Sequence, residues 1–297
     1  MSVVDRLQES RGPFLAALGL PSFALSLAIT TVSGLLPVIV AAQAGPVVAG
    51  ALVAVEGIFA LTVPLVVGPL SDRSGRRLPY MAGAGAVAGV ALVLIGLSGP
   101  LLLIALSLVV FYVAYFTYLT PYYALFPDLV EEEASGRSQG SLGTWREVGL
   151  GVGFVAGPTL LALWRPAPFV LAAVVLGVVT PLFGAVVRRR LRARGGERPK
   201  TQDGSSRGAV RRLLAEHPAI RWFVAANALW ELALAALRAF VVLFLTVGLG
   251  RSEAFASLVL GVVVVAALIA APVAGWLGDR FGNRRVLAGA VTVYGVG

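Results

Sequence analysis

The chain has 297 residues, of which 58% are hydrophobic and 13% charged, and its mean hydropathy of +0.88 excludes an ordinary soluble domain, where about 25% of residues are charged. It has no cysteine and one histidine, His217, which excludes a disulfide framework, a histidine cluster for a metal and a Ser/His triad. The net charge of +9 fits a membrane protein with basic loops or a nucleic-acid-binding protein, so the positions of the basic residues decide between them.

Apolar runs long enough to cross a bilayer recur along the sequence. A helix needs about 20 apolar residues to cross the hydrocarbon at about 1.5 Å per residue. We predict spans near residues 14–40, 47–70, 80–98, 101–125, 142–164, 167–187, 219–248 and 254–278, and the start of a ninth at 286. The runs are continuous and too long for the strands of a barrel, so the predicted fold class is all-α and polytopic.

The first run has a second interpretation as a cleaved signal peptide, because the small residues Ala42-Gln43-Ala44 follow it. The run from Phe14 to Val40 is, however, about twice as long as a signal-peptide core. Acidic and basic residues both precede it. We therefore favour a first transmembrane helix.

Basic residues predict the orientation of the spans. They gather before the first span and after the second, sixth and eighth spans, whereas the opposite set of loops contains only Arg165 and Arg251. Cytoplasmic loops carry the excess of arginine and lysine, so we expect a cytoplasmic N-terminus. The acidic residues Glu131 to Glu133 on that side contribute little to this rule. Arginine outnumbers lysine by 23 to 1, which is typical of GC-rich bacteria, and we expect a multi-pass protein of the bacterial inner (plasma) membrane.

Residues 188–218 interrupt the apolar pattern with a basic segment rich in glycine, serine and proline. Its basic residues are Arg188, Arg189, Arg190, Arg192, Arg194, Arg198, Lys200, Arg207, Arg211 and Arg212. We interpret it as a cytoplasmic linker anchored beside anionic lipid, with a nucleic-acid-binding arm as the less favoured alternative. The predicted organisation is an N-terminal six-helix bundle at 1–187, the linker at 188–218, and a partial C-terminal bundle at 219–297 with helices 7 and 8 and the start of helix 9.

A charged ten-residue loop occurs twice. GPLSDRSGRR, from Gly68 to Arg77, returns 207 residues later as GWLGDRFGNR, from Gly275 to Arg284, with six of ten residues identical. Six predicted spans separate the copies, so both lie on the same side of the membrane. The chain is therefore predicted to contain two parallel repeats.

The two loops resemble the signature of the major facilitator superfamily between its second and third and its eighth and ninth helices. The matching residues are Gly68, Asp72, Arg73, Gly75, Arg76 and Arg77, and Gly275, Asp279, Arg280, Gly282, Arg284 and Arg285. The resemblance covers essentially the whole chain and implies two six-helix bundles that rock about a central solute site. In that family the first-loop aspartate has its partner on the eleventh helix. By the repeat, a complete second half would extend to about residue 394, so we expect the chain to stop within helix 9.

These twelve matching residues are predicted to form a conformational latch. Gly75 and Gly282 permit the tight turn that joins antiparallel helices. Asp72 lies at the C-terminal end of its helix, where the helix dipole disfavours a carboxylate, so we expect it to bind an arginine or the N-terminus of another helix. Such a contact between bundles can form in one transport state and break in the other. The alternative is that the arginines only set topology.

Two carboxylates predicted within the bilayer are candidates for ion coupling. Glu56 lies about 14 Å from the outer end of the second span, near the midplane. Desolvation at that depth favours the neutral acid and suits a proton carrier, whereas converging oxygens would suit sodium. Structural hydrogen bonding is the alternative for Glu56. Glu231 is the candidate in the seventh span.

Polar and aromatic stripes on the first, fourth and seventh spans are predicted to line the solute cavity, as these helices do in the family. The candidates are Ser26, Thr30, Ser33, Tyr115, Tyr118, Tyr122, Asn227, Trp230 and Arg238, which lie at helical spacings. Helix packing is the alternative for the serines and tyrosines. Arg146 and Glu147 are placed near the cytoplasmic start of the fifth span, as part of an inner gate or as anchors.

The stretches PLVVGPLSDRSGRRLPY and PYYALFPDLVEEEASGRSQG are similar to the sucrose-transporter-like and glycoside-cation symporter branches. That similarity implies sugar uptake coupled to a proton or sodium gradient, with no cofactor, and the sequence has no GxxxxGK[ST] motif for ATP. GVGFVAGP in the fifth span resembles an antiporter motif, so proton-coupled efflux of a drug or metabolite is the alternative. A membrane-embedded enzyme is the second class considered, and a non-transporting sensor or an inactive fragment is the third. We expect a monomer, no enzyme activity, and a small solute, a coupling ion and lipid as partners.

Overall fold

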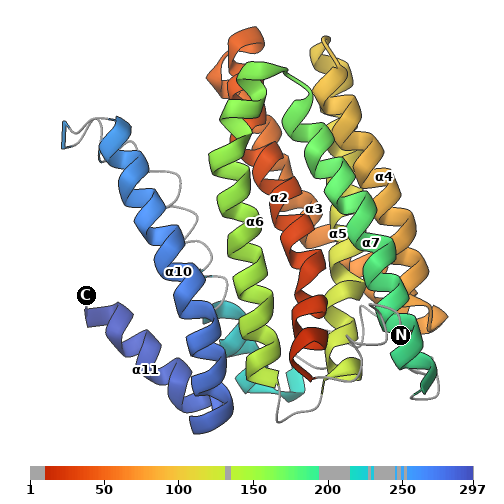
Figure 1. Cartoon of the computed structure of the whole chain (residues 1–297), viewed down its shortest axis with the longest axis vertical. Helices are drawn as coiled ribbons and strands as arrows, with labels where there is room; N and C mark the ends of the chain where they lie inside the picture. Colours follow the sequence, from red (N-terminus) through yellow and green to blue (C-terminus); the bar gives the residue numbers. More distant parts are fainter. Residues whose placement is uncertain are drawn as a thin grey trace. The chain divides into compact units, whose positions relative to one another are not determined.

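The computed structural model describes residues 11–130, 135–193, 215–226, 229–230, 245, 249–250 and 253–296. The regular structure of these residues is helical throughout, which confirms the all-α prediction. The helices labelled in Figure 1 are α2 (Arg11–Ala44), α3 (Pro46–Ser74), α4 (Arg77–Leu97), α5 (Leu101–Leu129), α6 (Ser135–Leu163), α7 (Ala167–Ala193), α10 (Glu253–Phe281) and α11 (Asn283–Val296).

The first six predicted spans coincide with helices α2 to α7. Each is long and apolar enough to cross a membrane, over Ala16–Ala44, Val47–Ser74, Arg77–Leu97, Leu101–Phe126, Gly136–Leu163 and Ala167–Arg189. The predicted eighth span lies within α10, and α11 begins at Asn283, close to the predicted start of the ninth span. The predicted seventh span, 219–248, lies mostly outside the described residues.

Two helix ends differ from the prediction by more than four residues. α6 begins at Ser135 instead of near residue 142, and α7 continues to Ala193, past the predicted end of the sixth span. Apolar runs locate the part of a helix that lies in hydrocarbon, whereas polar residues extend the same helix into the aqueous layer. Arg146 is therefore eleven residues inside α6, about 16 Å from its start. The position of Arg146 and Glu147 near the cytoplasmic start of the fifth span stays a prediction, because the helix start does not locate the edge of the hydrocarbon.

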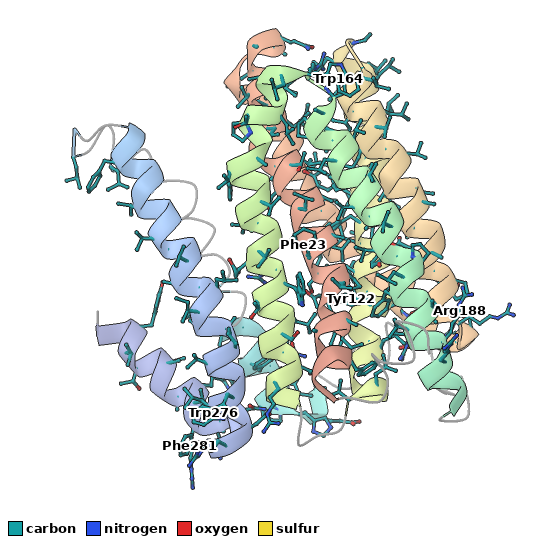
Figure 2. The ribbon with its side chains drawn as sticks, viewed as in Figure 1. Phe23, Tyr122, Trp164, Arg188, Trp276 and Phe281 are labelled. Carbon is teal, nitrogen blue, oxygen red and sulfur yellow. The ribbon has the colours of Figure 1, made fainter. Side chains whose placement is uncertain are left out.

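The core of the six-helix bundle is built around α2, which packs against α3, α6 and α7. α4 packs against α5 and α7, and α3 packs against α5. Aromatic rings fill the centre. Tyr122 of α5, labelled in Figure 2, is fully buried. It meets Phe183 of α7 edge to face, with ring centroids 5.7 Å apart. Burial of such rings stabilises the contact between helices that are far apart in sequence.

Small residues let α2 and α6 approach closely. Gly149, Gly153 and Gly157 recur every four residues along α6. A Cβ atom at Gly149 would collide with the backbone of Phe23, and one at Gly153 would lie 2.8 Å from the side chain of Thr30. Small residues allow this kind of van der Waals contact between transmembrane helices, where lipid leaves no hydrophobic drive for association. The contact fixes the rotation of α6 against α2.

The chain divides into two compact units, Met1–Lys200 with Ala267–Gly297, and Thr201–Ala266. Both charged loops lie in the first unit, together with Glu56 and the polar stripes of α2 and α5. The predicted domains at 1–187, 188–218 and 219–297 stay predictions.

Candidate functional site

The first charged loop is the turn between α3 and α4. α3 ends at Ser74, and Gly75 adopts the left-handed conformation with φ 59°, while its N–H donates to the carbonyl oxygen of Asp72 at 3.3 Å. In the second copy, Gly282 has φ 87° and separates α10 from α11. Positive φ is the conformation that glycine adopts without steric cost. The predicted role of the two glycines in tight turns is confirmed.

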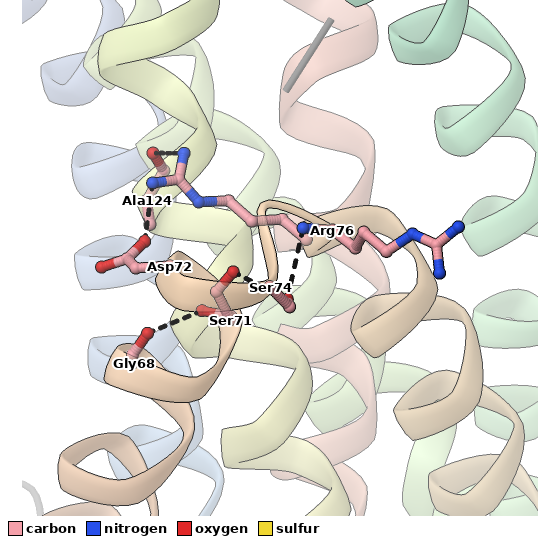
Figure 3. A network of polar contacts seen from close by, with 7 residues as sticks. Gly68, Ser71, Asp72, Ser74, Arg76 and Ala124 are labelled. Carbon is pink, nitrogen blue, oxygen red and sulfur yellow. Dashed lines mark hydrogen bonds and ion pairs between the residues drawn. The ribbon is translucent and has the colours of Figure 1, made fainter. Parts of the chain in front are cut away.

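Asp72 pairs with an arginine of its own loop (Figure 3). The Nη2 of Arg77 lies 2.8 Å from Oδ1 of Asp72, and its Nη1 donates to the carbonyl oxygen of Ala124 at 2.7 Å. The Arg77 side chain is buried, with 8% exposed. A cation in the last turns of α5 also stabilises the negative end of that helix. The pair therefore ties the α3–α4 turn to α5 within one bundle.

Hydroxyl groups complete the first loop. Ser71 donates to the carbonyl oxygen of Gly68 at 2.9 Å, and Ser74 donates to that of Ser71 at 3.0 Å. The N–H of Arg76 in turn donates to the Ser74 hydroxyl at 3.3 Å. The Ser71 carbonyl is one of the last four of α3, which have no helical partners, so the Ser74 hydroxyl satisfies it. Arg76 itself is exposed, as is Arg73.

In the second loop, Asp279 binds the start of another helix. Its carboxylate accepts hydrogen bonds from the N–H groups of Gly136 at 2.6 Å and Arg137 at 3.0 Å, at the N-terminus of α6. The Nε of Arg137 lies 3.2 Å from the same carboxylate. A negative charge is favoured at a helix N-terminus, where free N–H groups point outward. Asp72 and Asp279 occupy equivalent positions in the repeat but have different partners.

Glycines bring the backbones of α6 and α10 together beside Asp279. A Cβ atom at Gly140 would lie 2.9 Å from the carbonyl oxygen of Ala271 and 3.2 Å from the Cα of Gly275. A Cβ at Gly275 would collide with the carbonyl oxygen of Gly136. The equivalent Gly68 has no such neighbour, since the nearest atom to its Cβ position is 3.7 Å away. Gly275 therefore allows close packing of α10 against α6. The repeated sequence alone does not show this difference from Gly68.

Glu56 meets polar side chains from two neighbouring helices. The hydroxyl of Ser33 on α2 donates to Oε2 of Glu56 at 3.2 Å. Tyr112 of α5 is buried beside this pair, and its hydroxyl has no hydrogen bond of good geometry among the described residues. Its ring stacks on Phe59, one turn after Glu56, with centroids 6.3 Å apart. Tyr112 was missed by the sequence analysis, although it precedes Tyr115 by one helical turn.

The other polar residues of α2 and α5 contact neighbouring helices of the bundle. Tyr122 donates to the carbonyl oxygen of Leu18 at 2.7 Å and lies 3.2 Å from the Ser22 hydroxyl. Thr180 of α7 and Tyr118 are 3.3 Å apart through their hydroxyl groups.

Ser26, Thr30 and Tyr115 are also buried, the first two against the glycines of α6. Such contacts are expected of residues that pack helices together, which was the alternative given for the serines and tyrosines. A role in the solute cavity stays a prediction for all of these residues.

Arg146 and Glu147 form an ion pair in the middle of α6. The Nε of Arg146 is 3.5 Å from Oε1 of Glu147, and their side chains are 53% and 15% exposed. Of the candidates on the seventh span, Trp230 is exposed, and Asn227, Glu231 and Arg238 lie outside the described residues. Within the described ranges there is no group of three or more His, Cys, Asp or Glu residues placed to hold a metal.

Comparison with protein-family models decides the family. The model of the Major Facilitator Superfamily matches residues 18–250, well over half of the chain. The chain belongs to the Major Facilitator Superfamily. It is accordingly a multi-pass secondary transporter of a small-molecule solute and not an enzyme. Comparison with curated proteins gave no match.

The match to the Major Facilitator Superfamily includes the first charged loop and ends before the second. The second loop is therefore assigned to the superfamily signature from its repeat of the first loop and from its own geometry. Gly282 reproduces the turn of Gly75, and Asp279 again lies at the end of its helix.

Proposed function

We propose that this Major Facilitator Superfamily transporter is a symporter that couples uptake of a sugar to a proton or sodium gradient. The observation that carries the proposal is the placement of Glu56, a carboxylate ten residues inside the membrane-spanning helix α3 that is hydrogen-bonded to Ser33 of α2. Ionisable groups inside a bilayer are costly and are retained for transport or for structural pairing. Glu56 has a hydroxyl partner and no cationic one among the described residues, which favours transport.

Neutralisation of Glu56 would change the contacts among three helices. As an anion, Glu56 accepts the hydrogen bond of Ser33 and attracts the buried Tyr112 hydroxyl. As a neutral acid it can donate to one of them instead, and a bound sodium ion would compete for the same oxygens. Ion binding therefore changes the relative stability of arrangements of α2, α3 and α5, which is what coupling to a conformational change requires.

The contact of Asp279 with α6 supports alternating access. It joins the end of α10 to the start of α6 on the predicted cytoplasmic side. We assign it to the state in which that side is closed, and we expect it to break when the side opens. The ion pair of Asp72 with Arg77 lies within one bundle and would persist in both states.

Uptake into proteoliposomes tests the proposal. Labelled monosaccharides and disaccharides are supplied with an imposed proton gradient, with an imposed sodium gradient, and with none. We expect one sugar to accumulate under one gradient. Glu56→Gln should abolish accumulation while retaining sugar exchange, and Glu216→Gln, at an exposed position, is the matched control.

Two results would contradict the symporter. Normal accumulation by Glu56→Gln would remove that residue from coupling. Failure of every sugar to accumulate, together with gradient-dependent loss of a hydrophobic dye, would favour the efflux antiporter instead.

We also propose a monomer in the bacterial inner membrane with a cytoplasmic N-terminus. Arg188 and Arg189 are exposed at the end of α7, on the same predicted side as the two charged loops. Because the chain has no cysteine, single cysteines introduced at these ends report their side of the membrane by labelling in intact cells.

A further inference from the structure

An apolar groove of about 450 Å³ runs between α4 and α5, and all of its lining residues belong to these two helices. Buried Ala91 and Ser107 form its floor, and the exposed side chains of Val90, Leu94 and Leu106 form part of its walls. Because both floor residues are small, the two helices leave open a volume that larger side chains would fill. The groove is a feature of the membrane-spanning surface and takes no part in ion coupling through Glu56.

The groove lies in the half of α4 that is nearer the α4–α5 turn. Its lining residues extend from Ala86 to Leu94, or about 12 Å along the helix axis. The whole of α4 has 21 residues and is about 31 Å long, close to the thickness of about 30 Å of the hydrocarbon. The groove therefore follows the direction of acyl chains within one leaflet, where lipid and not water is the solvent.

Arg165 of the α6–α7 turn lies just beyond the end of this groove. The N–H of Ser98 donates to the carbonyl oxygen of Leu94, a groove residue, at 2.9 Å. The carbonyl oxygen of Ser98 in turn accepts the Nη2 of Arg165 at 2.6 Å. The Nε of Arg165 is buried and has no hydrogen-bond partner among the described residues. The guanidinium is thus held about one helical turn from the groove, with a donor that the bundle does not use.

Packing of the α6–α7 turn keeps Arg165 at this position. A Cβ atom at Gly96 of α4 would lie 3.0 Å from the Cα of Pro166, so the turn lies directly against the end of α4. Trp164, on the other side of Arg165 in the chain, is exposed (Figure 2). Tryptophan is enriched at the level of the lipid headgroups. The same level is therefore assigned to Arg165.

The charge on this side of the bundle favours one class of headgroup. The turns that join α2 to α3, α4 to α5 and α6 to α7 consist of residue 45, residues 98–100 and residues 164–166, and their one charged residue is Arg165. A guanidinium binds phosphate through charge-assisted hydrogen bonds. The ammonium group of a zwitterionic headgroup would meet no carboxylate in these turns, whereas an anionic headgroup has no such unpaired group.

We propose that the α4–α5 groove and Arg165 together bind one anionic phospholipid, with an acyl chain in the groove and the phosphate on the guanidinium. The site lies at the end of the bundle opposite the first charged loop, on the predicted outer side of the membrane. It does not depend on the identity of the solute or of the coupling ion. Because Arg165 already joins the α6–α7 turn to Ser98, the lipid would stabilise the contact between these two turns.

Photolabelling in vesicles tests the site. The protein is reconstituted in phosphatidylcholine with a trace of a lipid that has a diazirine in its acyl chain and either a phosphatidylglycerol or a phosphatidylcholine headgroup. Mass spectrometry of peptides measures adducts on the groove residues, relative to adducts on Val174 and Val178, which are exposed on α7. We expect about fivefold more relative labelling of the groove by phosphatidylglycerol, the preference that one basic residue near the surface gives an anionic lipid.

Variants separate the headgroup contact from the acyl-chain contact. Arg165→Gln should remove the preference for phosphatidylglycerol, and Arg165→Lys, which keeps the charge, should retain a preference of at least about twofold. Arg188→Gln, at the exposed opposite end of α7, is the matched control with an unchanged preference. Ala86→Phe fills part of the groove and should lower labelling by both lipids. Ala82→Phe, one turn away on the same helix and outside the groove lining, is its matched control.

Three results would overturn the proposal. Equal labelling of the groove by the two lipids in the unmodified protein would exclude a site for an anionic headgroup. A preference that survives in Arg165→Gln would exclude Arg165 as its cause; if that variant does not insert, loss of the preference in Arg165→Lys would exclude recognition by charge. Equal effects of Ala86→Phe and Ala82→Phe on labelling would exclude the groove as the place of the acyl chain.

Discussion

The contact of Asp279 with α6 predicts a substitution that shifts the transport equilibrium. Its carboxylate is 7% exposed and accepts two N–H groups at the helix N-terminus. Such a contact contributes about 1 kcal/mol, and up to about 2 kcal/mol where it is partly buried. The ion pair with Arg137 adds little, because that side chain is 61% exposed. Asp279→Ala should therefore disfavour the joined state of α6 and α10 by about 1–2 kcal/mol, or about 5–30-fold in its population ratio.

Distances between spin labels measure this shift. Gln139→Cys on α6 and Ala274→Cys on α10 place labels at exposed positions beside the contact, in a chain without other cysteines. Asp279→Ala should move population from the short to the long distance. An unchanged distribution would refute the latch. Asp72→Ala is the control, because it removes the equivalent carboxylate and should instead lower thermal stability by removing the ion pair of Asp72 with buried Arg77.

Three further substitutions test the geometry. Gly275→Ala should slow transport because its Cβ collides with the α6 backbone, while Gly68→Ala should transport normally; equal rates of solute exchange would refute this difference. Tyr122→Phe should cost about 1 kcal/mol of stability through its lost bond to the Leu18 carbonyl, seen as a lower unfolding temperature in detergent, and no change would contradict the packing role. Tyr112→Phe should leave that temperature unchanged, because its hydroxyl lacks a well-formed bond, but should alter the pH dependence of uptake; a pH profile like that of the unmodified protein would exclude it from coupling.

The sequence by itself determined the fold class and the positions of the membrane spans. Hydrocarbon thickness sets the length of an apolar helix, so apolar runs identify the first six spans without knowledge of their neighbours. The two turn glycines were also predictable, because positive φ at Gly75 and Gly282 depends on local backbone sterics.

The apolar pattern did not predict where the helices end. The polar residues from Ser135 onward continue α6 beyond the hydrocarbon, and hydropathy does not record that extension. Arg146 therefore lies near the start of the apolar run and yet eleven residues inside α6.

The partners of the polar residues were decided only by the tertiary structure. Asp72 and Asp279 have nearly the same local sequence, yet one binds Arg77 and the other binds the start of α6. Helical spacing placed the tyrosines of α5 on one face, but it did not show that Thr180 and Leu18 would meet two of them. A partner supplied by an element many residues away depends on how helices pack, and that packing is the information that a local pattern lacks.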